Sequence, residues 1–258
     1  MIFLFTKKAF FDSWDNLLSL IFYNLLYLIV LALLWLSFEV FITFKLLGLL
    51  LLLFAFVLNA FYLSSLSFQT KTYVYYEATQ FSAIFKNLFK KWQHSLLFAI
   101  IHVALLSLVL IVVPFYFSFN SLLFYTIALA LLWVALIVVF ALMYYYPLAI
   151  TMQEDKPFKT LKKSLLLVVD NIGFTLYLAL HTVANFILTI FFVTLIPGAS
   201  SIQLSHHVAL KFLLYKYDYL EENEKANKKE LPWDELLFEE DEKLGKRTLK
   251  GTIFPWRD

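Results

Sequence analysis

Long apolar runs without a charged residue dominate this chain, and short segments rich in lysine separate several of them. The charge-free runs cover residues 16–38, 46–70, 92–153 and 171–210. A helix that crosses the hydrocarbon core of a bilayer needs about 20 apolar residues. The first two runs therefore predict one spanning helix each, the third predicts two, and the fourth predicts one helix and a remainder.

The apolar residues are continuous rather than alternating, which favours helices over strands. Membrane β-strands alternate apolar and polar residues over about 10 positions, whereas Leu25–Leu36 is hydrophobic throughout. In lipid such a run satisfies its backbone hydrogen bonds only as a helix. We therefore predict an all-α, polytopic transmembrane helical bundle with amphipathic lead-in helices on the cytoplasmic side. Its five firm spans are expected at about 17–38, 46–68, 95–117, 122–150 and 172–196.

Lysines indicate the orientation of these helices, because lysine in short loops favours the cytoplasmic side. If the N-terminus is cytoplasmic, the inner segments that precede or connect the five spans hold ten lysines, whereas the outer loops hold only Lys45. The sequence therefore predicts a multi-pass protein of the bacterial inner membrane with a cytoplasmic N-terminus.

The segment after the Pro197–Gly198 break allows two interpretations. In the first, residues 200–217 lie on the outer surface as an amphipathic helix and leave the tail outside. In the second, which we favour, they return as a sixth span whose lysines reach the cytoplasmic face. The chain then consists of a transmembrane helical domain, 1–217, and a charged, largely disordered cytoplasmic tail, 218–258.

Amphipathic segments that carry lysine precede the first, third and fifth spans. In Ala83–Gln93 apolar residues recur at helical spacing, a pattern typical of a helix at the membrane interface. Lys7–Leu17 and Lys162–Ile172 share a weak repeat: two lysines, six residues, Asp-Asn and an aliphatic residue. The repeat predicts three similar hairpins, or it simply reflects how helices enter lipid. Candidate contacts with the membrane surface or a partner are Lys86, Lys90, Lys91, Lys159, Lys162 and Lys163.

Composition narrows the classes of function. The formal net charge is only +2, but residues 1–217 hold 13 basic and 7 acidic residues, whereas residues 218–258 hold 8 and 12. Basic residues at helix ends suit lipid headgroups better than nucleic acid. The absence of cysteine excludes disulfides, thiolate nucleophiles and cysteine-ligated zinc. The expected partners are the lipid bilayer and, through the tail, other membrane or cytoplasmic proteins. Neither nucleic acid nor any particular oligomeric state is indicated.

Polar side chains inside the predicted spans are few, and such residues are candidates for function. His102 and His181 lie in helices that enter from the same side, so they are expected at similar depth, with Asn185 one turn beyond His181. A facing pair of histidines would bind a ligand group or relay protons. In the alternative, which we favour, each histidine bonds a neighbouring helix. No metal-ligand cluster or catalytic motif is recognisable, so we predict no catalytic residue, metal or cofactor.

Several short motifs occur in an order that resembles one protein family. They are Trp14–Leu17 with Tyr23–Leu26, then Phe85–Trp92, then Tyr146–Leu148, and finally Ile196–Gly198 before a basic-ended helix. In these motifs, over about residues 8–217, the chain resembles the YesL-like family of small bacterial membrane proteins. It departs from the family at Leu58–Phe61, where the family usually has glycines and a Pro-Ala pair.

The resemblance implies an association with carbohydrate uptake but no biochemical activity and no catalytic residues. Together with the composition, it favours a non-enzymatic accessory or regulatory membrane protein. A small transporter or carrier with His102 and His181 at its site is the first alternative. A lipid- or glycan-modifying membrane enzyme is the second, and it would need a clustered acid–base set that the sequence does not display.

Overall fold

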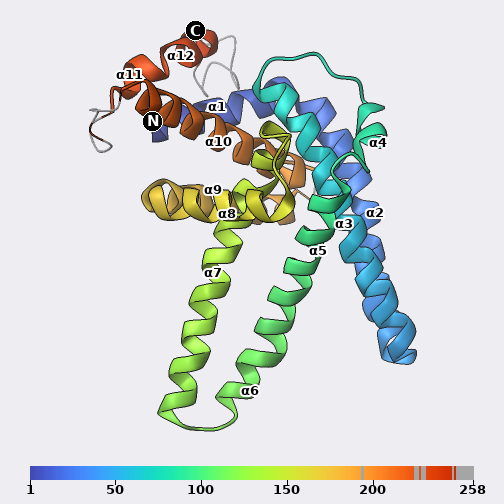
Figure 1. The fold of residues 1–258 in the computed structure, drawn as a ribbon. Helices are drawn as coiled ribbons and strands as arrows, with labels where there is room; N and C mark the ends of the chain where they lie inside the picture. The colour runs from blue at the N-terminus through green and yellow to red at the C-terminus, as the bar shows by residue number, and fades with distance from the viewer. Residues whose placement is uncertain (193–194, 224–226, 228–230, 246, 248–258) are drawn as a thin grey trace.

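A computed structural model describes residues 1–192, 195–223, 227, 231–245 and 247. All regular elements within this part of the chain are helices (Figure 1), which confirms the all-α prediction. Five of them are long and apolar enough to cross a membrane, so the protein is a multi-pass membrane protein. These candidate spans are Leu17–Thr43, Lys45–Val74, Trp92–Phe117, Leu122–Thr151 and Ile172–Phe191.

Two long helical hairpins extend from one end of the molecule (Figure 1). The first joins α2 (Leu17–Thr43) to α3 (Lys45–Val74). The second descends through α5 (Trp92–Ser107), the π-helical turn η1 (Leu108–Val112) and α6 (Val113–Phe117), and returns through α7 (Leu122–Thr151). The π-helical turn η1 ends two residues before Pro114, whose missing N–H prevents an ordinary helical hydrogen bond at this place.

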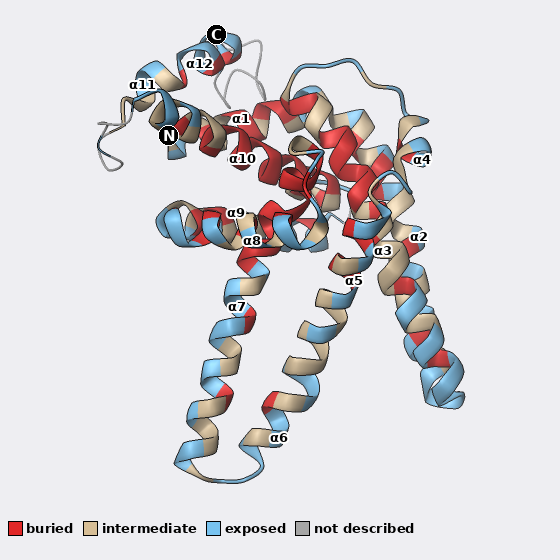
Figure 2. Cartoon of the chain, in the orientation of Figure 1, coloured by how far each residue is buried: buried red, intermediate tan, exposed pale blue. Residues whose placement is uncertain are grey.

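The remaining helices gather at the other end, in a part that we call the head. It contains α1, α4, α8, α9, α10, α11 and α12 together with the adjoining ends of the two hairpins. Figure 2 shows that buried residues concentrate in the head, whereas the far ends of the hairpins are largely exposed. The exposed hairpin residues are apolar, such as Leu50, Leu122 and Trp133, which suits contact with lipid. The bounds of the smaller head helices are α1 Ile2–Asp15, α4 Ala83–Asn87, α8 Pro157–Asp170, α9 Ile172–Phe191, α11 Trp233–Leu236 and α12 Phe238–Leu244.

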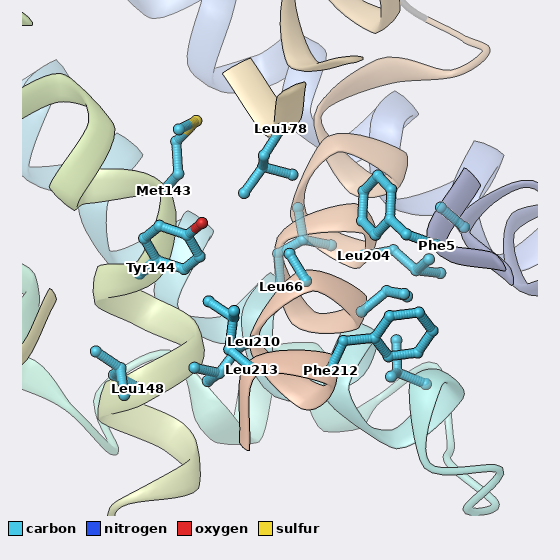
Figure 3. Packing of buried hydrophobic residues seen from close by; sticks show 14 of the residues in the cluster. Phe5, Leu66, Met143, Tyr144, Leu148, Leu178, Leu204, Leu210, Phe212 and Leu213 are labelled. Atoms are coloured by element: carbon cyan, nitrogen blue, oxygen red, sulfur yellow. The ribbon is translucent and has the colours of Figure 1, made fainter. Parts of the chain in front are cut away.

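The centre of the head is α10 (Gly198–Glu222), which packs against α1, α2, α3, α7 and α9. In Figure 3, Leu210 and Leu213 of α10 face Tyr144 and Leu148 of α7. This helix contains the segment 200–217, for which the sequence analysis favoured a sixth span. It is not among the five candidate spans, and it carries buried lysines and histidines. Their polar groups find partners on neighbouring head helices, so α10 serves as the core helix of the head.

A largely disordered tail was predicted from the sequence, and three stretches within its described part are helical. Residues 218–222 continue α10, and α11 and α12 follow after a break. The reason is an apolar stripe with helical spacing: Leu237 and Leu244 are buried, with Glu240 between them. Residues 248–258 lie outside the described part of the chain.

The two copies of the weak sequence repeat form the same kind of junction. Asn16 separates α1 from α2, and Asn171 separates α8 from α9. Asn16 Nδ2 donates to Asp12 O over 2.8 Å, and Asn171 Nδ2 donates to Leu167 O over 3.1 Å. Each amide therefore bonds a carbonyl in the last turn of the lead-in helix, and the Leu167 carbonyl also accepts the backbone N–H of Asn171 over 3.1 Å.

Candidate functional site

Four charged side chains meet inside the head and form what we call the charge cluster: Lys8, Asp12, Lys211 and Glu240. Lys8 Nζ lies 2.9 Å from Asp12 Oδ2 and 3.0 Å from Glu240 Oε2. Lys211 Nζ lies 2.6 Å from Glu240 Oε1. All four residues are buried, with 0 % of the Lys8 side chain and 1 % of the Glu240 side chain exposed. The Glu240 carboxylate thus bridges two buried ammonium groups.

Neutral groups complete the hydrogen bonding of the cluster. Lys211 Nζ donates to the carbonyl of Val74 over 3.1 Å, and Tyr215 OH donates to Glu240 Oε1 over 3.0 Å. Lys8 Nζ donates to Tyr76 OH over 2.7 Å. Tyr76 has a φ of +58°, a left-handed conformation that costs a non-glycine residue about 1–3 kcal/mol. These contacts bring α1, the end of α3, α10 and α12 together at one point.

Local helix patterns explain how these charges become buried. In α1 the buried positions include Phe5, Lys8, Ala9 and Asp12, which recur at the spacing of one helix face. Glu240 occupies the same kind of position in α12. A charged residue in the apolar stripe of an amphipathic helix signals a buried pair, because an unpaired charge there is very costly. The burial of Lys8, Asp12 and Glu240 was not predicted from the sequence.

The charge of each group in the cluster depends on its neighbours. Burial disfavours the ionised form of Glu240, but the ammonium groups of Lys211 and Lys8 outweigh it and lower its pKa to about 2. Burial raises the pKa of Asp12 to about 6, although Lys8 acts in the opposite direction. At neutral pH the two carboxylates therefore balance the two ammonium groups.

Two exposed ion pairs extend the connection between α1 and the tail. Lys7 Nζ lies 2.9 Å from Asp241 Oδ1 and also donates to the carbonyl of Gly245 over 2.9 Å. The Arg247 guanidinium donates to both carboxylate oxygens of Asp15, over 2.8 and 2.5 Å. Exposed pairs contribute little, typically less than about 1 kcal/mol each. The buried cluster is therefore the main polar attachment of the tail.

A cavity of about 280 Å³ lies between α1, α9 and α10, and it contains two of the predicted site residues. We call it the α1–α9 cavity. Its lining includes His181 and Asn185, and Asn185 Nδ2 donates to His181 Nδ1 over 3.1 Å. In the neutral imidazole this leaves the proton on Nε2. Ser13 and Ser201 also line the cavity, opposite the polar stripe of α9.

The third predicted residue, His102, does not line this cavity. Its Nδ1 donates to the carbonyl of Phe98 in its own helix over 3.0 Å, and its ring packs on the Phe98 ring. The structure therefore brings His181 and Asn185 together without His102. The adjacent His206 and His207 also separate, since His206 meets Thr182 of α9 and His207 meets Ser67 of α3.

Three of the six predicted surface lysines contact the α7–α8 connection. Lys159 Nζ is 2.7 Å from Asp155 Oδ1, and Lys163 pairs with the other oxygen of the same carboxylate. Lys91 donates to the carbonyl of Gln153 over 2.8 Å, and Lys90 lies over the Phe68 ring. Lys86 and Lys162 are exposed.

A glycine turn at the start of α10 is fixed by one amide from α2. Asn24 Nδ2 donates to the carbonyls of Leu195 and Pro197, and its Oδ1 accepts from the N–H of Ser200. Gly198 has a φ of +67°, and a Cβ atom there would lie 2.1 Å from the Asn24 amide. Only glycine fits this position. The turn carries Pro197 and Ser201, which line the α1–α9 cavity.

Comparison with known proteins identifies no relative of this chain. No family model matches this chain, and no curated protein or solved structure matches it. Among the described residues, no group of three or more histidine, aspartate or glutamate side chains is placed to hold a metal ion. The charge cluster and the α1–α9 cavity are thus two polar features of the described part of the head that carry candidate functional residues.

Proposed function

We propose that this protein is a non-enzymatic accessory or regulatory component of the cell membrane that serves a carbohydrate-uptake system. The observation that carries the proposal is the charge cluster, whose four charges are used to fix a tail helix onto the body of the protein. The link to carbohydrate uptake rests on the resemblance to the YesL-like family. In this proposal the head, with α1, α10 and α12, lies on the cytoplasmic side, in accordance with the lysine distribution. The two hairpins then supply four spans, and α9, although long and apolar enough to cross a membrane, lies within the head.

The docked tail offers a specific surface for a partner. With Glu240 directed inward, α11 and α12 expose Asp234, Glu235, Glu239 and Glu242. The opposite face is held by Leu237 and Leu244, so the acidic face keeps a fixed position relative to α1. A rigid acidic surface favours a basic patch on a partner and disfavours an acidic one. We infer that a membrane or cytoplasmic component of the uptake system binds here.

Two variants with the same change of charge test the proposal. Glu235 and Glu239 lie on the acidic face, whereas Glu221 and Glu222 are exposed at the end of α10. Each pair is replaced by glutamine in the full chain, and the permease and ATPase subunits of carbohydrate importers that co-purify from native membranes are quantified by mass spectrometry. We expect a several-fold loss for the first variant and none for the second. Equal recovery from both variants, or recovery of no importer subunit by the native chain, would contradict the proposal.

The proposed orientation has its own test. A reporter fused after Asp258 should give a cytoplasmic signal, because α10 and the tail belong to the same head as α1. A signal from the outer side would contradict the cytoplasmic position of the acidic face, whatever the outcome of co-purification.

A further inference from the structure

We propose that the α1–α9 cavity binds a single-chain, uncharged amphiphile from the bilayer, with its polar end at Ser201 and its aliphatic chain toward lipid. This inference is independent of the tail, since α11 and α12 contribute no residue to the cavity lining. His181 and Asn185 were predicted from the sequence as candidate site residues, and the proposal adds the class of ligand that they would bind.

The polar end of the cavity offers hydrogen-bonding groups that the protein does not use. Ser201 is only 6 % exposed as a residue, and its hydroxyl makes no hydrogen bond within the described chain. Its oxygen is not among the fully enclosed, unpaired side-chain atoms, so it keeps access to the cavity and can pair with a group of a ligand. Ser13 also lacks a side-chain hydrogen bond within the described residues, and His181 Nε2 is a further donor. These groups converge on one space from α1, α9 and α10.

The cavity wall carries no charged side chain, which indicates that the polar end of the ligand is uncharged. No lysine, arginine, aspartate or glutamate is among the described lining residues. The cationic and anionic side chains of α1 face the tail, where Lys8 and Asp12 join the charge cluster. A phosphate or carboxylate would therefore be desolvated in the cavity without a counter-charge, which is costly. Hydroxyl or carbonyl groups are matched to serine, asparagine and neutral imidazole.

The apolar end of the cavity is continuous with surface that suits lipid. Trp14, Leu188 and Phe192 line the cavity and are also exposed on the outside of the head. A tryptophan at the end of an amphipathic helix is typical of the boundary between hydrocarbon and headgroups. An amphiphile could therefore enter from the bilayer with its chain still in an apolar environment.

The volume limits the ligand to one chain. A cavity of about 280 Å³ lies just below the usual range for small-molecule sites, about 300–1,000 Å³. A phospholipid with two acyl chains is far larger than this space, whereas the polar end and first part of a single chain fit it.

Photolabelling tests the proposal with the full chain in phosphatidylcholine nanodiscs. The probe is a long-chain fatty alcohol that carries a diazirine near its hydroxyl, and labelled peptides are mapped by mass spectrometry. We expect saturable labelling of α1, α9 or the start of α10 that unlabelled fatty alcohol displaces. Ser201→Ala should weaken apparent affinity about fivefold, the value of one ordinary hydrogen bond.

Two controls separate a built site from bilayer contact. Ser64→Ala removes a fully buried, unpaired hydroxyl that lies outside the cavity lining, and it should leave labelling unchanged. A purely apolar hollow of about 340 Å³ between α3 and α5 should label, if at all, without saturation. Asn185→Ala provides a second cavity variant and should also weaken labelling.

The proposal would be overturned by non-saturable labelling of the cavity, or by equal affinity in the Ser201→Ala and Ser64→Ala proteins. Competition by a fatty-acid carboxylate as strong as that by the alcohol would overturn the uncharged class of ligand. Equal, saturable labelling of the α3–α5 hollow would show contact with bilayer lipid only.

Discussion

Replacement of Glu240 by glutamine should release the tail from the head while leaving the bundle folded. The carboxylate lies 2.6 Å from the Lys211 ammonium and 3.0 Å from that of Lys8, and both lysines are buried. The variant keeps the shape of the side chain but removes the charge that both lysines share. Only Asp12 then remains to balance two ammonium groups.

The size of the effect follows from the acidity of this group. The pKa of Glu240 is about 2, against an ordinary value of 4.5, because the two lysines favour the ionised form despite burial. Each tenfold change in acidity is worth about 1.4 kcal/mol, so the ionised carboxylate stabilises the docked state by about 3 kcal/mol. Removal of one partner of a buried ion pair costs a similar amount, about 3–5 kcal/mol. Opening of the docked tail should therefore become at least a hundredfold more frequent.

Amide hydrogen exchange measures this opening directly, since local opening sets the protection of each segment. Peptides that cover α11 and α12 should lose about two orders of magnitude of protection in the Glu240→Gln protein. Peptides from the α2–α3 hairpin should keep theirs. Glu239→Gln is the matched control, because Glu239 is exposed and its ion pair among the described residues, with Lys243, is long at 3.8 Å. Equal protection of the tail in the two variants would refute the role of the charge cluster.

Three further predictions concern pH, the glycine turn and the exposed ion pairs. In the same exchange experiment, protection of the tail should fall as pH drops below 4.5, because the pKa of Glu240 is lowered and its stabilising contribution is lost as it is protonated. Asp12 should have a smaller, opposite effect: its pKa is raised to about 6, so its protonation between pH 6 and about 4 stabilises the docked tail and raises protection. The Asp12→Asn variant should lack this rise. Gly198→Ala should lower the free energy of unfolding by about 1–3 kcal/mol, because φ is positive at this residue and the new Cβ atom would lie 2.1 Å from Asn24 Nδ2. Gly173→Ala is the control: no atom lies within 4 Å of its new Cβ, and the free energy of unfolding should rise by up to about 1 kcal/mol. Equal melting temperatures of the two variants would contradict the steric argument. Arg247→Ala should change tail protection by less than about 1 kcal/mol, and a loss as large as that of the Glu240 variant would show that the exposed pair carries the docking.

The candidate site was only partly predictable from the sequence. The place of Asn185 one turn beyond His181 was visible as helical spacing, and the structure joins the two by a hydrogen bond in one cavity. His102 was expected at the same depth, but depth along a helix does not determine the direction of a side chain around it. His102 instead bonds the carbonyl of Phe98 in its own helix.

The sequence by itself determined the helices that are long and apolar enough to span a membrane. Hydropathy is a property of each residue, and the bilayer sets the length that an apolar run must reach, so α2, α3, α5–α6, α7 and α9 could be predicted without knowledge of any contact. The predicted starts at 17, 122 and 172 coincide with the first residues of α2, α7 and α9.

Only the tertiary structure decided which charged residues of α1, α10 and α12 become buried and with which partners they pair. Lys8 and Glu240 are 232 positions apart, and neither sequence position indicates the other. A segment with the composition of α10 or α12 suits a membrane surface, a disordered tail or a protein core equally well, according to the partners that its charges find. Burial of a charge is tolerable only beside its counter-charge. The packing of α1, α10 and α12 supplies that arrangement, and it converts an amphipathic helix and an acidic tail into one folded head.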